Sequence, residues 1–373
     1  MKVLIAIDSF KGSMSSIEAG HATKEGILAA HPDAQVIIKP LADGGEGTTD
    51  ALIEGLNGKR IPLTVTGPFG DPISCYYGYL PETSTAVIEM AAAAGITLSD
   101  RHDPLTATTR GVGEMILDAV RRGCRDFIIG IGGSATNDGG IGMLSALGFS
   151  FLSENGSDAG EGGQALGKVC SVDVSGQDPR LKDCRFRVAC DVTNPLCGKN
   201  GATYIYGPQK GVTEDMKEPL DQAMSHYARV CASFLGKDCS LAEGAGAAGG
   251  LGFAFLSFLN AQLIPGTSLI LEAVGLEEEL KDADIVITGE GRLDHQTAMG
   301  KAPVGVASLA KKYGAKVIAF AGSVTADATA CNDAGIDAFF PIVRGVTTLE
   351  EAMDPVNAKA NLAACAEQVF RLL

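Results

Sequence analysis

Short apolar runs alternate with stretches of helical spacing at the start of the chain. The runs at 2–8 ("KVLIAID") and 35–40 ("QVIIKP") have the length and composition of buried strands. Ser15 and Glu18 have the spacing of a capping box, which predicts a helix that continues to about Ala30. The opening therefore predicts a strand–helix–strand–helix order, which is typical of a parallel sheet covered by helices.

The pattern changes in the middle of the chain, where three strand-like runs follow one another without a helical stretch between them. These runs occupy 60–68, 73–80 and 84–90, and they predict antiparallel or mixed strands. Further elements follow before residue 265, and we predict strands at 126–131 and 185–192 and helices at 110–122, 214–235 and 249–260.

Strand and helix patterns alternate again at the end, with strands predicted at 283–291, 315–322 and 336–343 and a helix at 301–314. Because both ends show this alternation, we predict an α/β protein with a discontinuous Rossmann-like parallel-sheet domain, residues 1–65 and 266–373. Residues 66–265 would form an inserted second α/β domain with mixed or antiparallel strands. We expect ligands to bind in a cleft between the two domains.

Composition excludes several classes of protein. The formal net charge of −15 argues against a nucleic-acid partner, and an anionic substrate would need a locally built positive field. The ten cysteines include no CxxC pair, so neither a zinc site nor a disulfide framework is predicted. The first apolar run is too short for a signal peptide, and no run approaches the roughly 18 residues of a membrane span. We therefore expect a cytoplasmic protein with no membrane partner.

A glycine-rich segment, "GIGGSATNDGG" at 130–140, directly follows a predicted strand. It is either a tight turn or a backbone cradle for a small anion. Its first six residues also fit the looser GxGxxA pattern of dinucleotide-binding proteins, which keeps an NAD-dependent oxidoreductase open. The residues of this loop that we predict to bind a cofactor or substrate are Gly132, Gly133, Ser134 and Asn137.

Four other predicted strands end in turns that contain carboxylates. A turn of Asp and Gly alone is common in proteins, but the carboxyl ends of strands in a doubly wound sheet face one crevice. Carboxylates that bind Mg²⁺ or a hydroxyl, next to cations that neutralise phosphate, are what phosphoryl transfer requires. The candidates from these turns and from a following helix start are Lys11, Asp43, Asp191, Glu290, Arg292, Asp294 and Lys301. Lys210, in "GPQKG", could hold an anion, but the default expectation is a solvated surface lysine.

Eight segments, in order from residue 8 to about residue 307, resemble those of the type 1 glycerate kinases of bacteria. They are "DSFKGS", "PLADGGEGT", "VIEMAAAAG", "GIGGSATNDGG", "VACDVTNP", "GPQKG", "GAGAAGGLG" and "ITGEGRLDHQT". One departure is Gly12, where members of the family often carry an acidic residue, and it affects only the expected start of the following helix. The resemblance implies a two-domain α/β fold and an ATP- and Mg²⁺-dependent kinase that converts D-glycerate to 2-phosphoglycerate. It also implies a role in glycolate, glyoxylate or aldarate catabolism.

On this hypothesis the candidate residues divide into four roles. Asp191 or Asp43 would orient the attacking hydroxyl, and Asp294 and Glu290 would bind Mg²⁺. Lys11, Arg292 and Lys301 would neutralise phosphate or carboxylate, and the 130–140 loop would donate backbone N–H groups.

Two alternatives stay open at this point. One is the NAD-dependent oxidoreductase of a small hydroxy acid, and the other is a non-catalytic metabolite-binding protein of the same fold. The sequence leaves the oligomeric state open, a homo-oligomer included.

Overall fold

The computed structural model describes residues 1–373, and the chain divides into two compact units. The first unit contains Met1–Asp43, Asp50–Asn57 and Thr267–Leu373, and the second contains Gly44–Thr49 and Gly58–Gly266. Strand β3 (Lys59–Thr66) lies in the second unit, whereas the predicted boundary at residue 65 assigned it to the first domain. The reason is that β3 pairs antiparallel along its length with β4 (Pro72–Leu80).

The first unit is built on a five-stranded sheet in which every pair of neighbours is parallel. The strand order is β13 (Ala338–Pro341), β12 (Lys316–Val324), β11 (Ile285–Leu293), β1 (Lys2–Ile5) and β2 (Gln35–Ile38). β1 lies between β2, which follows it in sequence, and β11, which comes almost 300 residues later. The strand order therefore reverses at the β1–β11 pair, and such a reversal is where open α/β sheets bind ligands.

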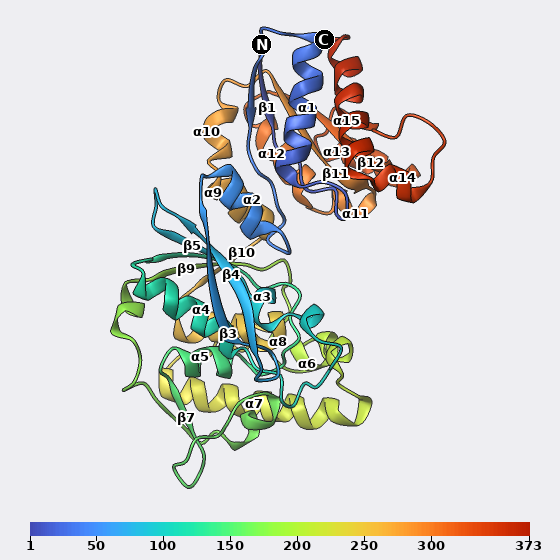
Figure 1. Ribbon diagram of the computed structural model, residues 1–373. Helices are drawn as coiled ribbons and strands as arrows, with labels where there is room; N and C mark the ends of the chain where they lie inside the picture. Colours follow the sequence, from blue (N-terminus) through green and yellow to red (C-terminus); the bar gives the residue numbers. More distant parts are fainter. The chain divides into compact units, whose positions relative to one another are not determined.

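Helices cover this sheet. They are α1 (Ser16–Ala30), α2 (Thr48–Gly55), α9 (Gly266–Ala273), α10 (Leu276–Leu280), α11 (His295–Ala298), α12 (Ala302–Lys311), α13 (Ala330–Asp333), α14 (Leu349–Met353) and α15 (Pro355–Phe370). Ser15 and Glu18 form the predicted capping box at the start of α1. Figure 1 shows α1 and α15 side by side, and their apolar residues join those of the strands in one core cluster. The first and last helices of this unit therefore pack together.

The second unit has a six-stranded mixed sheet and a small antiparallel pair, β7 (Ser150–Leu152) with β8 (Ser171–Asp173). The mixed sheet has the order β10 (Gln262–Ile264), β9 (Arg185–Ala189), β6 (Asp126–Gly130), β5 (Thr85–Glu89), β4 and β3. The four strands from β10 to β5 are parallel, and β4 and β3 are antiparallel to their neighbours. The predicted fold class, a parallel-sheet α/β domain with an inserted α/β domain of mixed strands, is confirmed.

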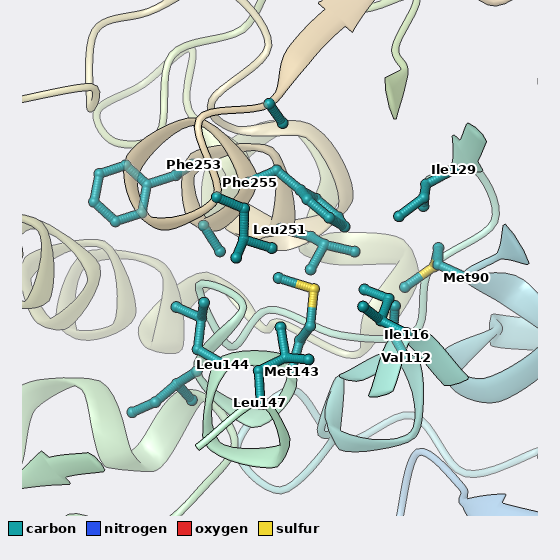
Figure 2. Close-up of a cluster of buried hydrophobic side chains, with 14 of the residues drawn as sticks. Met90, Val112, Ile116, Ile129, Met143, Leu144, Leu147, Leu251, Phe253 and Phe255 are labelled. Atoms are coloured by element: carbon teal, nitrogen blue, oxygen red, sulfur yellow. The ribbon is translucent and has the colours of Figure 1, made fainter. Parts of the chain in front are cut away.

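The helices of the second unit enclose its core. They are α3 (Ala91–Ala94), α4 (Arg110–Arg121), α5 (Ile141–Ala146), α6 (Ala202–Tyr206), α7 (Glu214–Leu235) and α8 (Ala247–Phe258). Figure 2 shows side chains of α4, α5 and α8 meeting those of β6 in a buried apolar cluster. Val112, Ile116, Met143, Leu251 and Phe255 are all completely buried there. This packing fixes the start of α5, and with it the end of the glycine-rich loop that follows β6.

Candidate active site

The first unit contains a cavity of about 440 Å³ at the carboxyl ends of β1 and β11. Past the end of β1 the chain stays aligned with β11, because the Asp8 N–H donates to Gly289 O at 2.9 Å. The polar lining of the cavity consists of Asp8, Ser9, Lys11, Ser13, Asp43, Glu290, Arg292, Asp294, Lys301 and Ser323. Six of the predicted catalytic, metal-binding and phosphate-binding residues thus lie together around one cavity.

Asp8 is the carboxylate of this cavity that is most withdrawn from water. Its exposed fraction is 7%, and its Oδ1 accepts a hydrogen bond of 2.7 Å from the Ser9 N–H. Burial, reinforced by the charge of Asp43, raises the pKa of Asp8 to about 7. Asp8 was not among the predicted site residues. The available signal was an aspartate at the end of the apolar run at 2–8.

Lys11 and Asp43 form an ion pair at the cavity, with Lys11 Nζ 3.4 Å from Asp43 Oδ2. The charge of Asp43 raises the pKa of Lys11, so the ammonium group stays protonated. Both side chains are accessible to solvent, and such pairs contribute little to stability. An accessible cation beside a cavity is free to change partner when an anionic ligand binds.

The end of β11 supplies a second group of charges. Arg292 Nε lies 3.7 Å and Lys301 Nζ 3.9 Å from opposite oxygens of Asp294. Asp294 also begins α11, because its side chain accepts the Thr297 N–H at 3.2 Å. The Thr297 hydroxyl donates to Glu290 Oε1 at 2.5 Å, and burial raises the pKa of Glu290. Two carboxylates and two cations therefore lie close together in the lining of the cavity.

The rest of the lining is apolar, is called the apolar wall below, and was not predicted. It consists of Phe10, Ile342, Val343, Leu349, Ala352, Met353 and Ala358. Leu349 is 76% exposed although it is a large apolar side chain. No signal in the sequence distinguishes these residues from ordinary core residues, because only folding brings the C-terminal segment against the turn after β1.

The predicted binding loop belongs to the second unit, where it follows β6. Gly132 and Gly133 are exposed, whereas Ser134 and Asn137 are buried. Asn137 Nδ2 donates to Thr203 Oγ1 at 3.1 Å. The next helix, α5, begins only at Ile141, so the glycines do not open a helix as they do in a dinucleotide-binding motif.

Asp191 also belongs to the second unit, two residues after the end of β9. It is exposed, and its Oδ1 accepts a hydrogen bond of 2.9 Å from the Gly266 N–H. Because β9 and β6 are parallel neighbours, Asp191 and the 130–140 loop leave the same edge of the mixed sheet. The predicted site residues thus form two groups, one in each unit. That both groups meet in one crevice stays a prediction.

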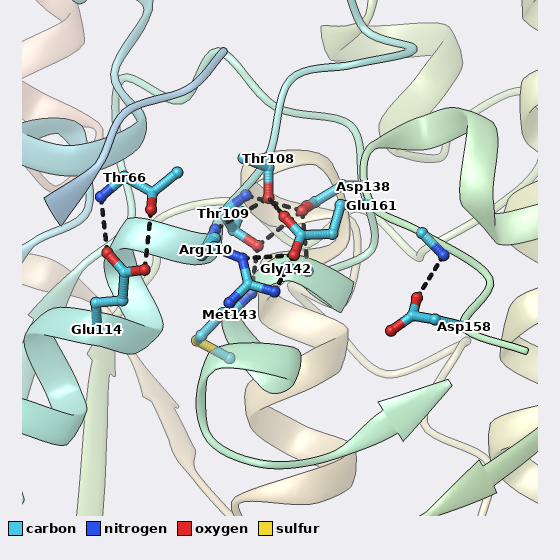
Figure 3. A network of polar contacts seen from close by, with 11 residues as sticks. Thr66, Thr108, Thr109, Arg110, Glu114, Asp138, Gly142, Met143, Asp158 and Glu161 are labelled. Carbon is cyan, nitrogen blue, oxygen red and sulfur yellow. Dashed lines mark hydrogen bonds and ion pairs between the residues drawn. The ribbon is translucent and has the colours of Figure 1, made fainter. Parts of the chain in front are cut away.

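Asp138, the last polar residue of the glycine-rich loop, is fully buried in a hydrogen-bond network (Figure 3). Its carboxylate accepts from the Thr109 N–H at 2.9 Å and the Thr109 hydroxyl at 2.8 Å. It also accepts from the N–H groups of Gly140 at 3.0 Å and Gly142 at 3.3 Å. Asp138 therefore joins the loop to the starts of α4 and α5, and its function is to hold the loop in place.

Lys210 contradicts the expectation of a solvated surface lysine. It lies in the short 3₁₀ helix Pro208–Lys210 and is only 1% exposed. Its ammonium group donates to Ser134 Oγ at 2.7 Å and to Thr136 O at 2.6 Å. A buried cation therefore contacts the glycine-rich loop.

No cluster of three or more His, Cys, Asp or Glu side chains has the arrangement of a metal site. No helix combines the length and apolar composition needed to cross a bilayer.

Comparisons with known proteins agree over almost the whole chain. Residues 3–373 match the model of the glycerate kinase family. The chain is 51% identical to a glycerate kinase of Bacillus subtilis (strain 168), covering 95% of this chain and 93% of that protein. It is 49% identical to a glycerate 2-kinase of Escherichia coli (strain K12), covering 94% and 93%. A crystal structure described as glycerate kinase 2 from Salmonella typhimurium LT2 superposes with a TM-score of 0.92 at 46% identity, covering 99% and 97%.

Proposed function

This chain belongs to the glycerate kinase family and is an enzyme, a kinase; from this premise we propose that it transfers the γ-phosphoryl group of ATP to D-glycerate. The proposed products are 2-phosphoglycerate and ADP, within glycolate, glyoxylate or aldarate catabolism. Family membership favours a kinase over an oxidoreductase or a non-catalytic binding protein. The observation that carries the proposal is the cavity of the first unit, whose lining combines carboxylates and cations with the apolar wall.

We assign the nucleotide to this cavity. It lies at the reversal of strand order, and its volume falls within the range of small-molecule sites. Lys11, Arg292 and Lys301 supply positive charge for the phosphates, and the apolar wall suits the nucleoside. The net charge of −15 makes such a local cluster of cations necessary for binding a polyanion.

Asp8 is the group that we assign to accept the proton of the attacking hydroxyl. A general base works best when its pKa is near the working pH, and burial gives Asp8 that property. Asp43 and Asp191 are the other candidates. Asp43 is paired with Lys11, and Asp191 lies in the second unit beside the glycine-rich loop.

The residues at the end of β11 fit Mg²⁺, which takes one or two carboxylates and completes its shell with water and phosphate oxygens. Burial, reinforced by the charge of Asp294, raises the pKa of Glu290, and a positive ion between the two carboxylates would relieve that repulsion. Together they would hold the ion. Bound there, Mg²⁺ would neutralise charge on the phosphates during transfer.

The apolar wall gives a test of the nucleotide assignment. In the double variant Leu349→Ser with Met353→Ser, we expect the KM for ATP to rise about thirtyfold, because each side chain contributes roughly 1 kcal/mol of apolar burial when the nucleoside binds. The KM for D-glycerate should stay within about twofold. Steady-state kinetics with each substrate varied in turn measures both values.

A matched control is Val356→Ser, because Val356 is 75% exposed and near in sequence but does not line the cavity. This control should leave both KM values unchanged. A rise in the KM for D-glycerate alone in the double variant would reassign the cavity to the acid substrate.

The proposed reaction itself is tested by ADP release from purified protein with ATP, Mg²⁺ and D-glycerate. We expect ADP only when D-glycerate is present, and none with glycerol or with other hydroxy acids. Carbon-resolved NMR of the product should show phosphate at carbon 2. Absence of D-glycerate-dependent ADP would reject the proposed function.

A further inference from the structure

We infer that residues 132–134, here called the oxyanion turn, bind a carboxylate or phosphate group, and that the buried ammonium group of Lys210 makes this turn electropositive. The loop was predicted to donate backbone N–H groups, whereas Lys210 was expected to be a solvated surface lysine, with anion binding as the alternative. The inference rests on the proposed function only in naming the two sources of the anion, the carboxylate of D-glycerate and the phosphates of ATP.

The first observation concerns the backbone of the oxyanion turn. The N–H groups of Gly132, Gly133 and Ser134 donate to no acceptor in the protein. The turn is nevertheless fixed, because the Ile96 N–H donates to Gly133 O at 2.8 Å and the Ala135 N–H donates to Ala94 O at 2.9 Å. Gly133 has φ of +72°, and consecutive donors around a left-handed residue form the kind of concavity that binds anions.

Solvent access separates this turn from an ordinary buried loop. Gly132 and Gly133 are exposed, whereas the four polar residues from Ser134 to Asp138 are buried. A Cβ atom at Gly132 would meet nothing closer than 3.9 Å. The exposed backbone therefore has room for a ligand directly above a layer of buried polar side chains.

The second observation is the hydrogen bonding of Lys210 beneath the turn. Both acceptors of its ammonium group, Ser134 Oγ and Thr136 O, are uncharged, and no carboxylate lies within ion-pair distance. A hydroxyl that accepts from an ammonium group keeps its own proton for another acceptor. The Ser134 hydroxyl is therefore set to donate, and the adjacent cation polarises it.

A buried cation whose hydrogen-bond partners are uncharged lowers the free energy of unfolding. Burial lowers the pKa of Lys210 to about 7, and the negative charge of Asp138 opposes that shift. Asp138 offsets only part of the cost of burying the Lys210 ammonium group, because four other groups already donate to the Asp138 carboxylate. An anion on the oxyanion turn would supply the missing negative charge and would stabilise the protonated lysine.

The test uses two variants, Lys210→Met and Ser134→Ala, with Lys168→Met as the matched control. Lys168 is an exposed lysine of the second unit. Calorimetry on the full chain measures the Kd of D-glycerate and of inorganic phosphate, which needs no turnover. We expect Lys210→Met to weaken one of these ligands at least tenfold and Ser134→Ala to weaken the same ligand about threefold to tenfold.

The ligand that is affected identifies the source of the anion. Loss of D-glycerate binding, together with a raised KM for D-glycerate and an unchanged KM for ATP, would show that the oxyanion turn binds the carboxylate of D-glycerate. Loss of phosphate binding with a raised KM for ATP would show that the oxyanion turn binds a phosphate group of ATP. If Lys210→Met does not fold, the Kd values of Ser134→Ala for the two ligands test the inference. The inference is overturned if the folded variants bind both ligands within twofold of the unaltered protein.

The pH dependence separates an electrostatic role from a purely structural one. Because the lowered pKa leaves Lys210 protonated below pH 7 and increasingly neutral above it, affinity for D-glycerate, whose carboxylate stays ionised throughout, should fall between pH 7 and 8.5 in the unaltered protein. Lys210→Met should show a flat profile over the same range. If the unaltered protein forms no ADP yet binds D-glycerate with this profile, the proposed function fails and the inference stands.

Discussion

Asp8→Asn is expected to lower kcat by about 100- to 1,000-fold, within the range that a positioned general base contributes. Asparagine has nearly the same shape, and its amide oxygen can still accept the Ser9 N–H that Asp8 accepts at 2.7 Å. It cannot accept a proton from the attacking hydroxyl. Steady-state kinetics with D-glycerate and ATP measures the loss.

The pH profile adds a second test of Asp8. In the unaltered protein, kcat/KM should fall as the pH drops below about 7, because Asp8 must be ionised to act as a base. Asp8→Asn should lose this dependence. Asp191→Asn and Asp43→Asn are the comparison variants, since these residues are the other candidates for the same role. Full activity in Asp8→Asn with loss in Asp191→Asn would move the role to Asp191.

Thermal stability distinguishes this loss of activity from unfolding. The pKa of Asp8 is raised in the folded state, so the native protein binds more protons than the unfolded chain between about pH 4 and 7. The contribution of Asp8 to stability is therefore present at acid pH and is lost as the pH rises through 7. Asp8→Asn should raise the melting temperature at pH 8, relative to the unaltered protein, more than at pH 5.

Asp138→Ala is expected to lower the free energy of unfolding of the second unit by about 3 to 5 kcal/mol. The change leaves the buried N–H groups of Thr109, Gly140 and Gly142 without the acceptor that they share. Figure 3 shows this acceptor with Thr109 and Gly142. The change also removes the negative charge that acts on Lys210. Urea unfolding followed by circular dichroism measures the loss.

Asp158 provides a matched control for this variant. It accepts a single backbone N–H, from Gly160, in an exposed loop shown in the same figure. Asp158→Ala should change stability by about 0.5 kcal/mol or less, the range for surface substitutions. Asp138→Asn should lose less stability than Asp138→Ala, because its amide oxygen keeps part of the network. Equal stability of Asp138→Ala and Asp158→Ala would contradict the role assigned to Asp138.

Much of the architecture could be predicted from the order of apolar and polar residues. The predicted strand at 73–80 and helix at 214–235 correspond to β4 and α7 within one residue at each end. The domain to which β3 belongs could not be predicted, because its apolar sequence is equally consistent with the last strand of one domain and the first strand of the next. Only its pairing with β4 decides the question.

The candidate site was predictable to the extent that its residues end strands. Glu290 and Arg292 were found in this way, since a polar residue after a buried strand is visible in the sequence and the carboxyl ends of parallel strands share an edge. The apolar wall was not predictable. Leu349 and Met353 lie more than 330 residues from Phe10 in the chain, and nothing local marks them as lining residues.

By itself, the sequence determined the fold class, the glycine-rich loop and the types of charged residue available for phosphoryl transfer. Only the tertiary structure decided which of these charges are buried. Asp8 and Lys210 are an ordinary aspartate and lysine in the printed sequence, yet packing raises the pKa of one and lowers that of the other, each to about 7. The reason is that the energy of a charge depends on the water removed around it, and distant parts of the chain remove that water only when it folds.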